Sequence, residues 1–573
     1  MMLYLELRNH VVQAVQAVVA QHYPGASVEG SWGALKLEAP REVAHGDLAT
    51  NAAMVLAKPL GVSPRVLADM FASAIANHPA IANVEIAGPG FLNIRLKPQV
   101  FLHLAQDILA SPETYGNIDI SAGRKALVEY VSINPTGPIH VGHGRNAVFG
   151  DAIARLLEKA GFEVWREYLL NDAGNQIRVL VRSLHARYLQ QFGVEVEVPA
   201  DGYPGEYLVD IAKQLCERDG DAWLHERDEQ VLFQGLRPFA VDACLALIKN
   251  DIATLGIPFD RYFSEHEMHT QTTRMPDVVA ILREKGLVYE GVLPPPKGKD
   301  VADYTPVELT LFRATAFGLP EDQAVYNRAG QPTYFGQDIA YHYDKLQRGY
   351  SLLATVIGVD QAGAFRPLAK AIEALTGRDD IYHPVPYEMV KVLRNGEPVK
   401  LSKRAGNIVL LADVLKEVGT DAFRFAMLVV KPTTPLTFDL AKAVEKSMEN
   451  PVFYAQYAHA RLAAVLRQAA DLPLTEHHSG ADHTISEAAL HVLRTLMMYP
   501  AMLEQAATSL EPHRVADYVT TLAAAIHSWY GAEKWLDQDS LADTAQRLSI
   551  VRAAQVVLAD GLSLCGVSAP QSM

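Results

Sequence analysis

The sequence predicts an α/β protein in three parts: a central domain on a doubly wound parallel sheet, a smaller N-terminal α+β domain and a C-terminal all-α helix bundle. Three observations predict this class. Strand-like apolar runs alternate with amphipathic helical patterns in the middle of the chain, both patterns mix before it, and almost everything after about residue 412 is helical. With 573 residues the chain is also too long for one hydrophobic core. We expect domains at residues 1–112, 113–410 and 411–573, with an insertion at about 190–300.

The composition is that of an ordinary soluble globular protein, with 49% hydrophobic and 20% charged residues. Cys216, Cys244 and Cys565 lie far apart, without a zinc-binding or disulfide spacing, so we expect a cytoplasmic protein that holds no zinc. No stretch approaches the roughly 20 uninterrupted apolar residues that a membrane span needs. The net charge of −15 does not exclude nucleic acid, because a local basic surface can coexist with an acidic total.

The first domain mixes two kinds of pattern, helical at 3–20 and 64–77 and strand-like at 34–38 and 83–96. A glycine-rich turn at residues 87–90 precedes Phe91 and Asn93. The pattern alone favours a tight turn with a core phenylalanine. The alternative is a platform on which Phe91 stacks an unpaired base while Asn93 reads the edge of that base.

The central domain is organised around a strand–loop–helix segment. An apolar run at 127–133 indicates a buried strand, prolines and a glycine at 134–138 forbid a helix, and a 3.6-residue apolar period then begins. His140 and His143 lie at the mouth of that helix, where backbone N–H groups and the helix dipole could hold a phosphate between the two imidazoles. The alternative is a pair of surface histidines near a helix start.

Later segments repeat this architecture. A strand at 162–170 is followed by a polar segment, 171–176, suited to capping a helix at 176–190, and by helices to about 265 that read as an insertion. Strand patterns return at 310–314, 332–339 and 352–359, and the last precedes a helix at 365–375. Both strand–turn–helix units therefore belong to one Rossmann-type sheet.

A second motif follows a predicted hairpin at 385–401, whose Asn-Gly turn is the strongest short hairpin signal. Lys400, Ser402 and Lys403 stand at its end, with a glycine hinge after them. Two lysines on such a loop suit a transient clamp on a leaving pyrophosphate. The alternative is a solvated basic loop.

Together the two motifs resemble the signatures of class I aminoacyl-tRNA synthetases. Five surrounding segments are similar to the arginyl-tRNA synthetase family: residues 128–135, 171–176, 421–424, 450–461 and 566–570. The resemblance spans nearly the whole chain. Val141 and Leu401 replace the isoleucine and methionine of the class pattern and Arg404 replaces its final serine, while both lysines are retained.

The resemblance implies an arginine–tRNA ligase, which activates arginine with ATP to arginyl-adenylate and transfers it to the 3′ end of tRNA(Arg). It implies catalytic roles for His140, His143, Lys400 and Lys403, which bind ATP together with Gly142 and Ser402. It implies arginine contacts from Glu129, Ser132, Asn134, Tyr334, Asp338 and Gln361. The chemistry agrees, because a guanidinium requires carboxylates, and Glu129 and Asp338 stand where strands are expected to reach the site.

The end domains are then expected to bind tRNA. The resemblance implies contacts from Phe91, Asn93, Tyr454, Tyr457, His459, Arg461 and Met573, although helical spacing equally suits core aromatics for some tyrosines. It also implies a monomer whose amino-acid activation generally needs bound tRNA. Magnesium is expected with ATP, although the sequence shows no acidic cage for a metal.

Three other functions remain open. One is a synthetase-like enzyme for another amino acid, although Glu129 and Asp338 favour a cationic one. A second is a small-metabolite nucleotidyltransferase, in which the end domains have no role. A third is a non-catalytic RNA-binding paralogue, against which the retained histidines and lysines argue.

Overall fold

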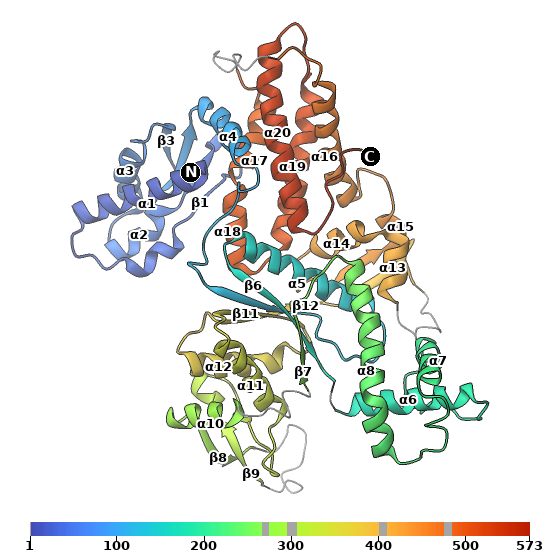
Figure 1. Cartoon of the computed structure of the whole chain (residues 1–573). Helices are drawn as coiled ribbons and strands as arrows, with labels where there is room; N and C mark the ends of the chain where they lie inside the picture. The colour runs from blue at the N-terminus through green and yellow to red at the C-terminus, as the bar shows by residue number, and fades with distance from the viewer. Residues whose placement is uncertain (1, 173, 266–273, 295–305, 400–408, 475–483) are drawn as a thin grey trace. The chain divides into compact units, whose positions relative to one another are not determined.

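The structure is a computed structural model that describes the chain except residues 1, 173, 266–273, 295–305, 400–408 and 475–483 (Figure 1). It contains two compact units. One comprises residues 119–446 with 510–513, and the other comprises residues 1–118, 447–509 and 514–573.

A five-stranded parallel sheet forms the centre of the first unit (Figure 1). Its spatial order is β12 (Tyr382–Tyr387), β11 (Leu352–Gly358), β5 (Lys125–Glu129), β6 (Glu163–Leu170) and β7 (Arg261–Ser264). The chain runs outward from β5 to β7, then returns to the other side of β5 with β11. This reversal is the strand order of a Rossmann-type sheet, and it opens a crevice at the carboxyl ends of β5 and β11. The predicted fold class is confirmed.

Helices connect and cover these strands. Helix α5 (Val141–Lys159) joins β5 to β6, and α12 (Ala362–Thr376) joins β11 to β12. Before β11 the chain forms β8 (Val288–Val292), β9 (Glu308–Phe312), β10 (Gln323–Ala324), α10 (Arg274–Glu284) and α11 (Tyr334–Gln347). The antiparallel sheet β10-β9-β8 confirms the strand expected at 310–314.

The strand predicted at 332–339 is wrong, because helix α11 begins at Tyr334. The Thr333 hydroxyl caps this helix by accepting a hydrogen bond from the Gly336 N–H at 3.1 Å. The apolar residues of this run then continue at helical spacing, with Phe335 against the core and Ile339 buried in it. A short apolar run does not distinguish the two structures, and here the capping threonine decides for helix.

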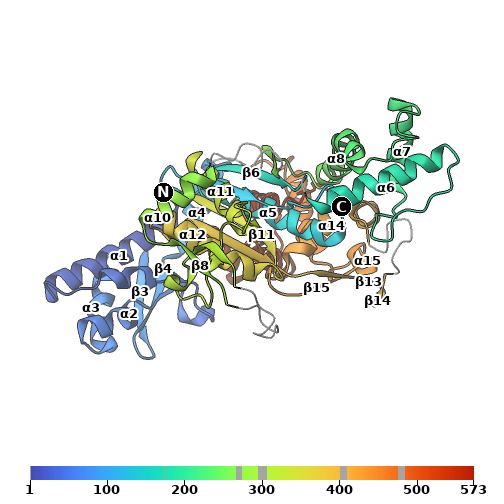
Figure 2. The ribbon, with the colours of Figure 1, turned by 90° about the horizontal axis from the view of Figure 1, so that it is seen from below.

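The insertion packs three helices around their own core, side by side in both views (Figures 1 and 2): α6 (Asn175–Gln191), α7 (Tyr207–Asp219) and α8 (Glu229–Thr254). The N-cap of α6 is Gly174, which has no side chain, so the side-chain cap predicted for this helix is absent at that position. The insertion was expected to be helical to about 265, but β7 follows α8 and joins the main sheet. Of the helices in the described ranges, α8 is long and apolar enough to cross a membrane by length and composition, and its Leu236 and Cys244 are buried in this core.

A second, three-stranded sheet lies in the same unit, in the order β14 (Glu397–Pro398), β13 (Val390–Arg394) and β15 (Leu436–Asp439). The predicted hairpin is the β13–β14 pair, turning at Asn395 (φ 53°) and Gly396. Strand β15 was not expected in a helical segment. It is accompanied by α13 (Leu411–Val418), α14 (Thr420–Leu428) and α15 (Leu440–Ala443), so residues 411–446 pack within the unit of the parallel sheet.

The other unit combines the two ends of the chain. Its first part is an antiparallel sheet in the order β1 (Leu37–Glu38), β2 (Leu48–Thr50), β4 (Phe91–Leu96) and β3 (Ile81–Ala87), packed with α1 (Leu3–His22), α2 (Ala52–Leu60), α3 (Pro64–Ile75) and α4 (Pro98–Ala110). Its second part is a helix bundle of α16 (Pro451–Gln468), α17 (Glu487–Met497), α18 (Tyr499–Ser509), α19 (His513–Ala532) and α20 (Leu541–Leu564). Both predicted classes, α+β and all-α, are confirmed.

Candidate active site

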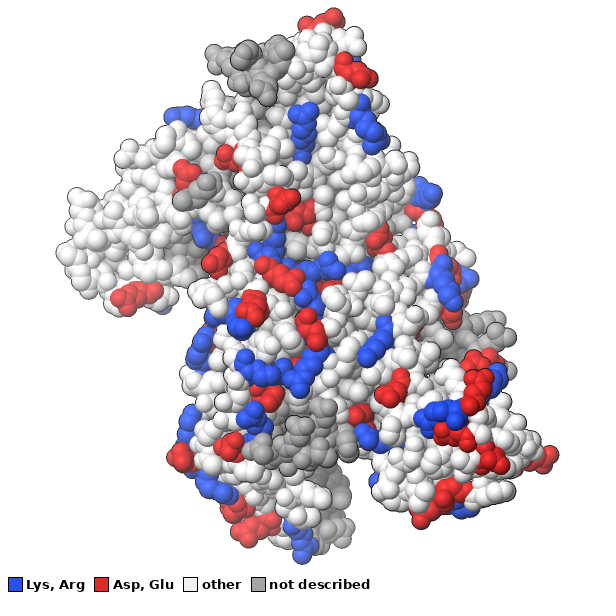
Figure 3. Space-filling model, viewed as in Figure 1, with Lys and Arg blue, Asp and Glu red and all other residues white. Residues whose placement is uncertain are grey.

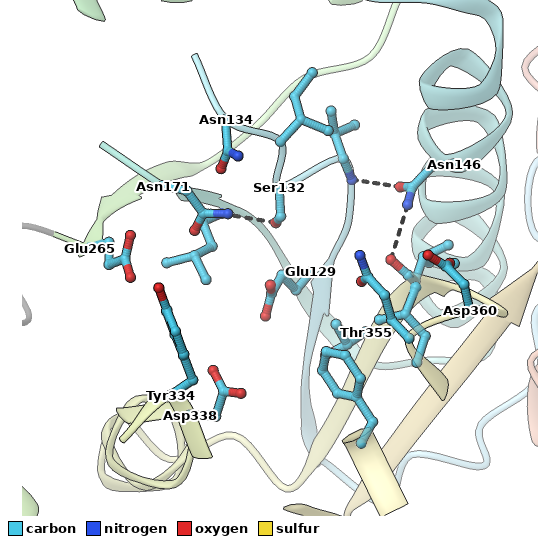
Figure 4. A pocket seen from close by; sticks show the side chains of 18 of the residues that line it. Glu129, Ser132, Asn134, Asn146, Asn171, Glu265, Tyr334, Asp338, Thr355 and Asp360 are labelled. Carbon is cyan, nitrogen blue, oxygen red and sulfur yellow. Dashed lines mark hydrogen bonds between the residues drawn. The ribbon is translucent and has the colours of Figure 1, made fainter. Parts of the chain in front are cut away.

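A cavity of about 1020 Å³ opens at the carboxyl ends of β5 and β11 (Figure 4). The first turns of α5 and α11 complete it. Eight residues predicted for the site line this one cavity: Glu129, Ser132, Asn134, His140, His143, Tyr334, Asp338 and Gln361. Its volume is at the upper end of the range for small-molecule sites, so an amino acid and a nucleotide fit together.

The backbone after β5 is held in an unusual conformation. The strand predicted to continue to residue 133 ends at Glu129, and Val131 and Ser132 then adopt positive φ angles of 65° and 42°. Asn146 of α5 stabilises the bend: its Oδ1 accepts from the Val131 N–H at 2.6 Å and its Nδ2 donates to the Val356 carbonyl at 3.0 Å (Figure 4). A β-branched residue with positive φ is a genuine outlier, and such strain concentrates at functional sites.

His140 and His143 stand at the first turn of α5. His140 is the N-cap, and its Nδ1 accepts from the N–H groups of Gly142 at 3.1 Å and His143 at 3.4 Å. This arrangement leaves the proton of the neutral ring on Nε2. The two rings stack with centroids 3.5 Å apart, so a phosphate cannot lie between them as the sequence suggested. It would bind along their edges instead.

Burial makes this pair neutral. It lowers the pKa of His140, and it lowers the pKa of His143 to about 3, with the neighbouring His140 as a second cause. Neutral imidazoles still donate hydrogen bonds to phosphate oxygens. The positive end of the α5 dipole adds to that attraction.

The other side of the cavity is acidic. Of the four carboxylates that line the cavity, Glu129, Glu265 and Asp338 lie toward Tyr334, whereas Asp360 lies beside Asn146 of α5 (Figure 4). The described lining residues include neither lysine nor arginine. In Figure 4, Glu265, Tyr334 and Asp338 lie on the same side of the cavity. Burial, together with the charges of Glu129 and Glu265, raises the pKa of Asp338 to about 7, against the lowering effect of Lys345. This side therefore suits a cationic ligand.

Asp338 and Tyr334 come from a helix, contrary to the prediction that a strand carries them. They are four residues apart on α11, and therefore on the same face. Tyr334 is 81% exposed, at the cavity mouth, while Asp338 lies deeper.

Other predicted residues lie elsewhere. Gly142 is buried in the first turn of α5, where an added Cβ would lie 2.9 Å from the His140 ring, so only glycine fits beside this cap. Lys400, Ser402 and Lys403 lie outside the described residues.

Sequence reasoning missed several polar residues that line this site, among them Glu265, Asp360 and Asn146. Glu265 follows β7, a strand that was not predicted, and Asp360 follows β11. Asn146 offered a usable signal, because it stands three residues after His143 on the same helix face.

The residues predicted to bind tRNA differ in exposure. Phe91 is 37% exposed at the start of β4, Asn93 is partly buried on that strand, and Met573 is 56% exposed. On α16 the Arg461 guanidinium lies 4.6 Å from the Tyr457 ring centroid and 4.3 Å from that of Tyr530.

His459 requires a correction. It is only 2% exposed, and its Nδ1 lies 2.9 Å from the Pro570 carbonyl, so it anchors the C-terminal segment instead of offering its ring to RNA. Tyr454 is partly buried, with its ring 4.6 Å from that of His527. Tyr457, Arg461 and Tyr530 form a contacting cluster on this face, in which Tyr530 is 44% exposed and the other two are partly buried.

Acidic and basic side chains are interspersed over the face shown in Figure 3. Within the described ranges, no three His, Cys, Asp or Glu side chains lie close enough together to hold a metal ion.

Comparison with known proteins defines the family. Residues 5–96 match the model of the arginyl-tRNA synthetase N-terminal domain, residues 104–463 that of the class I (R) tRNA synthetase catalytic domain, and residues 455–573 that of the DALR anticodon-binding domain. The arginine–tRNA ligase of Roseobacter denitrificans is 43% identical over 592 aligned residues that cover both chains completely. That of Methylorubrum extorquens is 44% identical over 553 residues, 94% of each chain.

Solved structures show the same fold. The arginyl-tRNA synthetase of Thermus thermophilus has a TM-score of 0.76 at 22% identity, with both chains fully covered. A catalytic-domain match over most of the chain and full-length relatives above 40% identity confirm the predicted resemblance: this chain belongs to the arginyl-tRNA synthetases, the arginine–tRNA ligases of class I.

Proposed function

We propose that the cavity between β5 and β11 activates L-arginine with ATP and then esterifies the 3′ end of tRNA(Arg). The observation that carries this proposal is the division of one cavity into two chemically different sides. Neutral histidines at a helix N-terminus suit phosphate, and the opposite carboxylates suit a guanidinium.

The acidic side would bind arginine. We assign the guanidinium to Asp338 and Tyr334, because a carboxylate can accept two parallel N–H bonds from its fork and a phenol can accept or stack against it. Ser132, Asn134 and Gln361 line the same cavity and would hold the α-amino end, with Glu129 close by.

The histidine side would bind ATP. His140 and His143 donate to the phosphates, and Gly142 lets the backbone of α5 approach them. Lys400, Ser402 and Lys403 are assigned to the departing pyrophosphate. The described lining has no lysine or arginine for that task.

Magnesium is expected to arrive with ATP. The described residues provide no group of three metal-ligating side chains, and Asp360, in the turn after β11, is a single carboxylate. The part of the chain that the structure describes therefore does not define a resident metal site, and no step below depends on one.

The reaction then proceeds in two steps. A carboxylate oxygen of arginine attacks the α-phosphorus of ATP in line, a P–O bond to the β-phosphate breaks, and arginyl-adenylate and pyrophosphate form. A terminal ribose hydroxyl of the tRNA next attacks the adenylate carbonyl, and AMP leaves. No protein nucleophile is needed, so catalysis consists of positioning and of stabilising developing charge.

The other unit would bind tRNA(Arg). We assign Phe91 and Asn93 to base contacts in the N-terminal domain, and Tyr457, Arg461 and Met573 to contacts in the helical domain, with Tyr454 beside them. The aromatic and guanidinium groups of this set, exposed at Phe91 and partly buried at Tyr457 and Arg461, suit stacking on unpaired bases. By family resemblance we also propose a cytoplasmic monomer that needs bound tRNA for activation.

Arginine-dependent ATP–pyrophosphate exchange, measured with and without tRNA(Arg), tests the proposal. We expect exchange with arginine, and strong stimulation by tRNA. Exchange driven by another amino acid but not by arginine would overturn the substrate assignment. Nucleotidyl transfer to a small metabolite, or RNA binding with no exchange, would support one of the other two functions.

A further inference from the structure

One face of α11 carries five residues that lead from the cavity into the protein interior. Their spacing of four, three, four and three residues places them on one stripe: Tyr334, Asp338, Tyr341, Lys345 and the C-cap Arg348. The first two reach the cavity, and the other three contact the strands behind it. Any movement of α11 along its axis therefore moves both ends of this stripe together.

Two ion pairs hold the inner end of the stripe, one fully buried and one partly buried. The Lys345 ammonium lies 2.5 Å from the Glu129 carboxylate, and both side chains are almost fully buried. Arg348 donates two hydrogen bonds to Glu167 at 2.6 and 2.9 Å, and the Tyr341 hydroxyl donates to the same carboxylate at 2.8 Å. Glu129 and Glu167 face each other in the β5–β6 register.

These pairs restrict the position of α11. A helix rises about 1.5 Å and rotates by about 100° per residue, so a slip of one residue would separate both ion pairs. A buried charge that loses its partner is strongly destabilising. The pairs therefore oppose such a slip, and with it a displacement of Asp338 and Tyr334.

The same pairs distribute charge around the cavity. Lys345 neutralises Glu129, whereas Asp338 has no ion-pair partner among the described residues. The charges of Glu129 and Glu265 raise the pKa of Asp338, and the charge of Lys345 lowers it. His342, on the next turn of α11, is buried, and burial together with Lys345 holds its pKa well below the usual range. Of Glu129 and Asp338, Asp338 is thus the carboxylate left for a ligand cation.

We propose that Lys345 is a specificity-determining positioning residue for the cationic amino acid. Its ion pair with Glu129 fixes how far Tyr334 and Asp338 of α11 reach into the cavity. Because Glu129 is paired in this way, Asp338 is the carboxylate that binds the guanidinium. This inference rests on the proposed function of the cavity, and it assigns Lys345 a role through Glu129 and α11 without contact with the substrate.

Lys345→Met in the full-length enzyme tests this inference, with Lys370→Met as the matched control. Lys370 lies on α12, where its ammonium bonds Glu373 at 2.7 Å, and it does not line the cavity. For Lys345→Met we expect the KM for arginine to rise at least about tenfold while the KM for ATP stays within about twofold. The decrease of kcat/KM for arginine at low pH, the acid limb of the pH profile, should move to higher pH in Lys345→Met. The reason is that the variant lacks the cation that favours the ionised form of Asp338.

A double variant, Glu129→Gln with Lys345→Met, separates position from charge. It removes both partners, so no unpaired buried charge remains to prevent folding. Its acid limb should return toward that of the unmodified enzyme, while the KM for arginine stays raised because α11 has lost the Lys345–Glu129 pair and keeps only the bonds to Glu167. Melting temperatures of all variants check folding.

Three results would overturn the inference. The first is a Lys345→Met variant whose KM for arginine and pH dependence at low pH match those of Lys370→Met. The second is an equal increase in the KM values for arginine and ATP in Lys345→Met. The third is an unchanged KM for arginine in the double variant. Absence of arginine-dependent exchange in the unmodified enzyme would instead refute the proposed function, so the two failures are distinguishable.

Discussion

The imidazole rings of His140 and His143 stack on each other at the first turn of α5, with centroids 3.5 Å apart and planes inclined by 24°. The Nδ1 of His140 is occupied by two backbone N–H groups. The pair therefore forms one neutral, preorganised donor surface for phosphate, in contrast to two independent cations.

This surface predicts a selective loss of rate. His143→Ala should lower kcat by about 10²–10³-fold, the usual cost of removing one preorganised donor to developing charge, about 3–4 kcal/mol. The Kd for tRNA should change by less than about twofold, since the residue is not assigned to RNA. Single-turnover adenylate formation and a tRNA filter-binding assay measure the two effects. His383→Ala, at a histidine bonded to the Asp380 carbonyl outside the cavity, is the control. Equal losses of rate and of tRNA binding would contradict the assignment.

The raised pKa of Asp338 predicts a pH-dependent affinity for arginine. Its pKa is about 7 in the free enzyme, mainly because of burial. The protonated acid cannot form a charge-assisted pair with the guanidinium, so the KM for arginine should rise as pH falls below 7, by up to about tenfold per unit. Steady-state kinetics between pH 6 and 8.5 measure this dependence. Asp338→Asn should bind arginine weakly with a flat profile, and an unchanged slope in that variant would assign the titration to another group.

The same carboxylate predicts a cost in stability. The folded pKa of Asp338 lies above its ordinary value of 3.8, so the proton favours the folded state. The contribution of this group to the free energy of unfolding is therefore full below about pH 4 and is lost as pH rises to about 7. Asp338→Asn should melt at a higher temperature than the unmodified protein at pH 8, and the difference should shrink toward pH 5. A lower melting temperature for Asp338→Asn than for the unmodified protein at pH 8 would contradict this prediction, because it would mean that the ionised carboxylate stabilises the fold.

Close packing behind the cavity predicts one severe substitution. An added Cβ at Gly150 of α5 would lie 2.1 Å from Cγ of the buried Tyr130, so Gly150→Ala should destabilise the fold by about 2–3 kcal/mol or more. Gly531→Ala is the matched control, because its Cβ would meet no atom within 4 Å and alanine favours helix. Chemical denaturation compares the two. Similar midpoints for both variants would show that Tyr130 can move aside without cost.

Local sequence patterns predicted the parts of the site that depend on neighbouring residues. The strand before Glu129, the helix after His140 and the Asn-Gly hairpin are each specified by residues that are adjacent in the chain. The two acids were also identified, although Asp338 was assigned to a strand. The capping bond between Thr333 and Gly336 is the local feature that the apolar run concealed.

Non-local features were missed for a common reason. Strands β7 and β15 are only four residues long, and each is stabilised by pairing with a distant strand, β6 and β13. Short strands of this kind carry little periodic signal of their own. Glu265 was not predicted as a site residue, because it directly follows β7 and reaches the cavity only through the pairing of β7 with β6.

The sequence by itself determined the class of the sheet, the two histidines at the helix mouth and the family to which the chain belongs, because these depend on short spacings and on motifs. Only the tertiary structure decided which of Glu129 and Asp338 is paired inside the protein. Lys345 is 216 residues from Glu129 in the chain, and their ion pair is what leaves Asp338 without one. The electrostatics of the cavity depend on such distant pairs, since the charge of a buried group is set by the neighbours that folding brings to it.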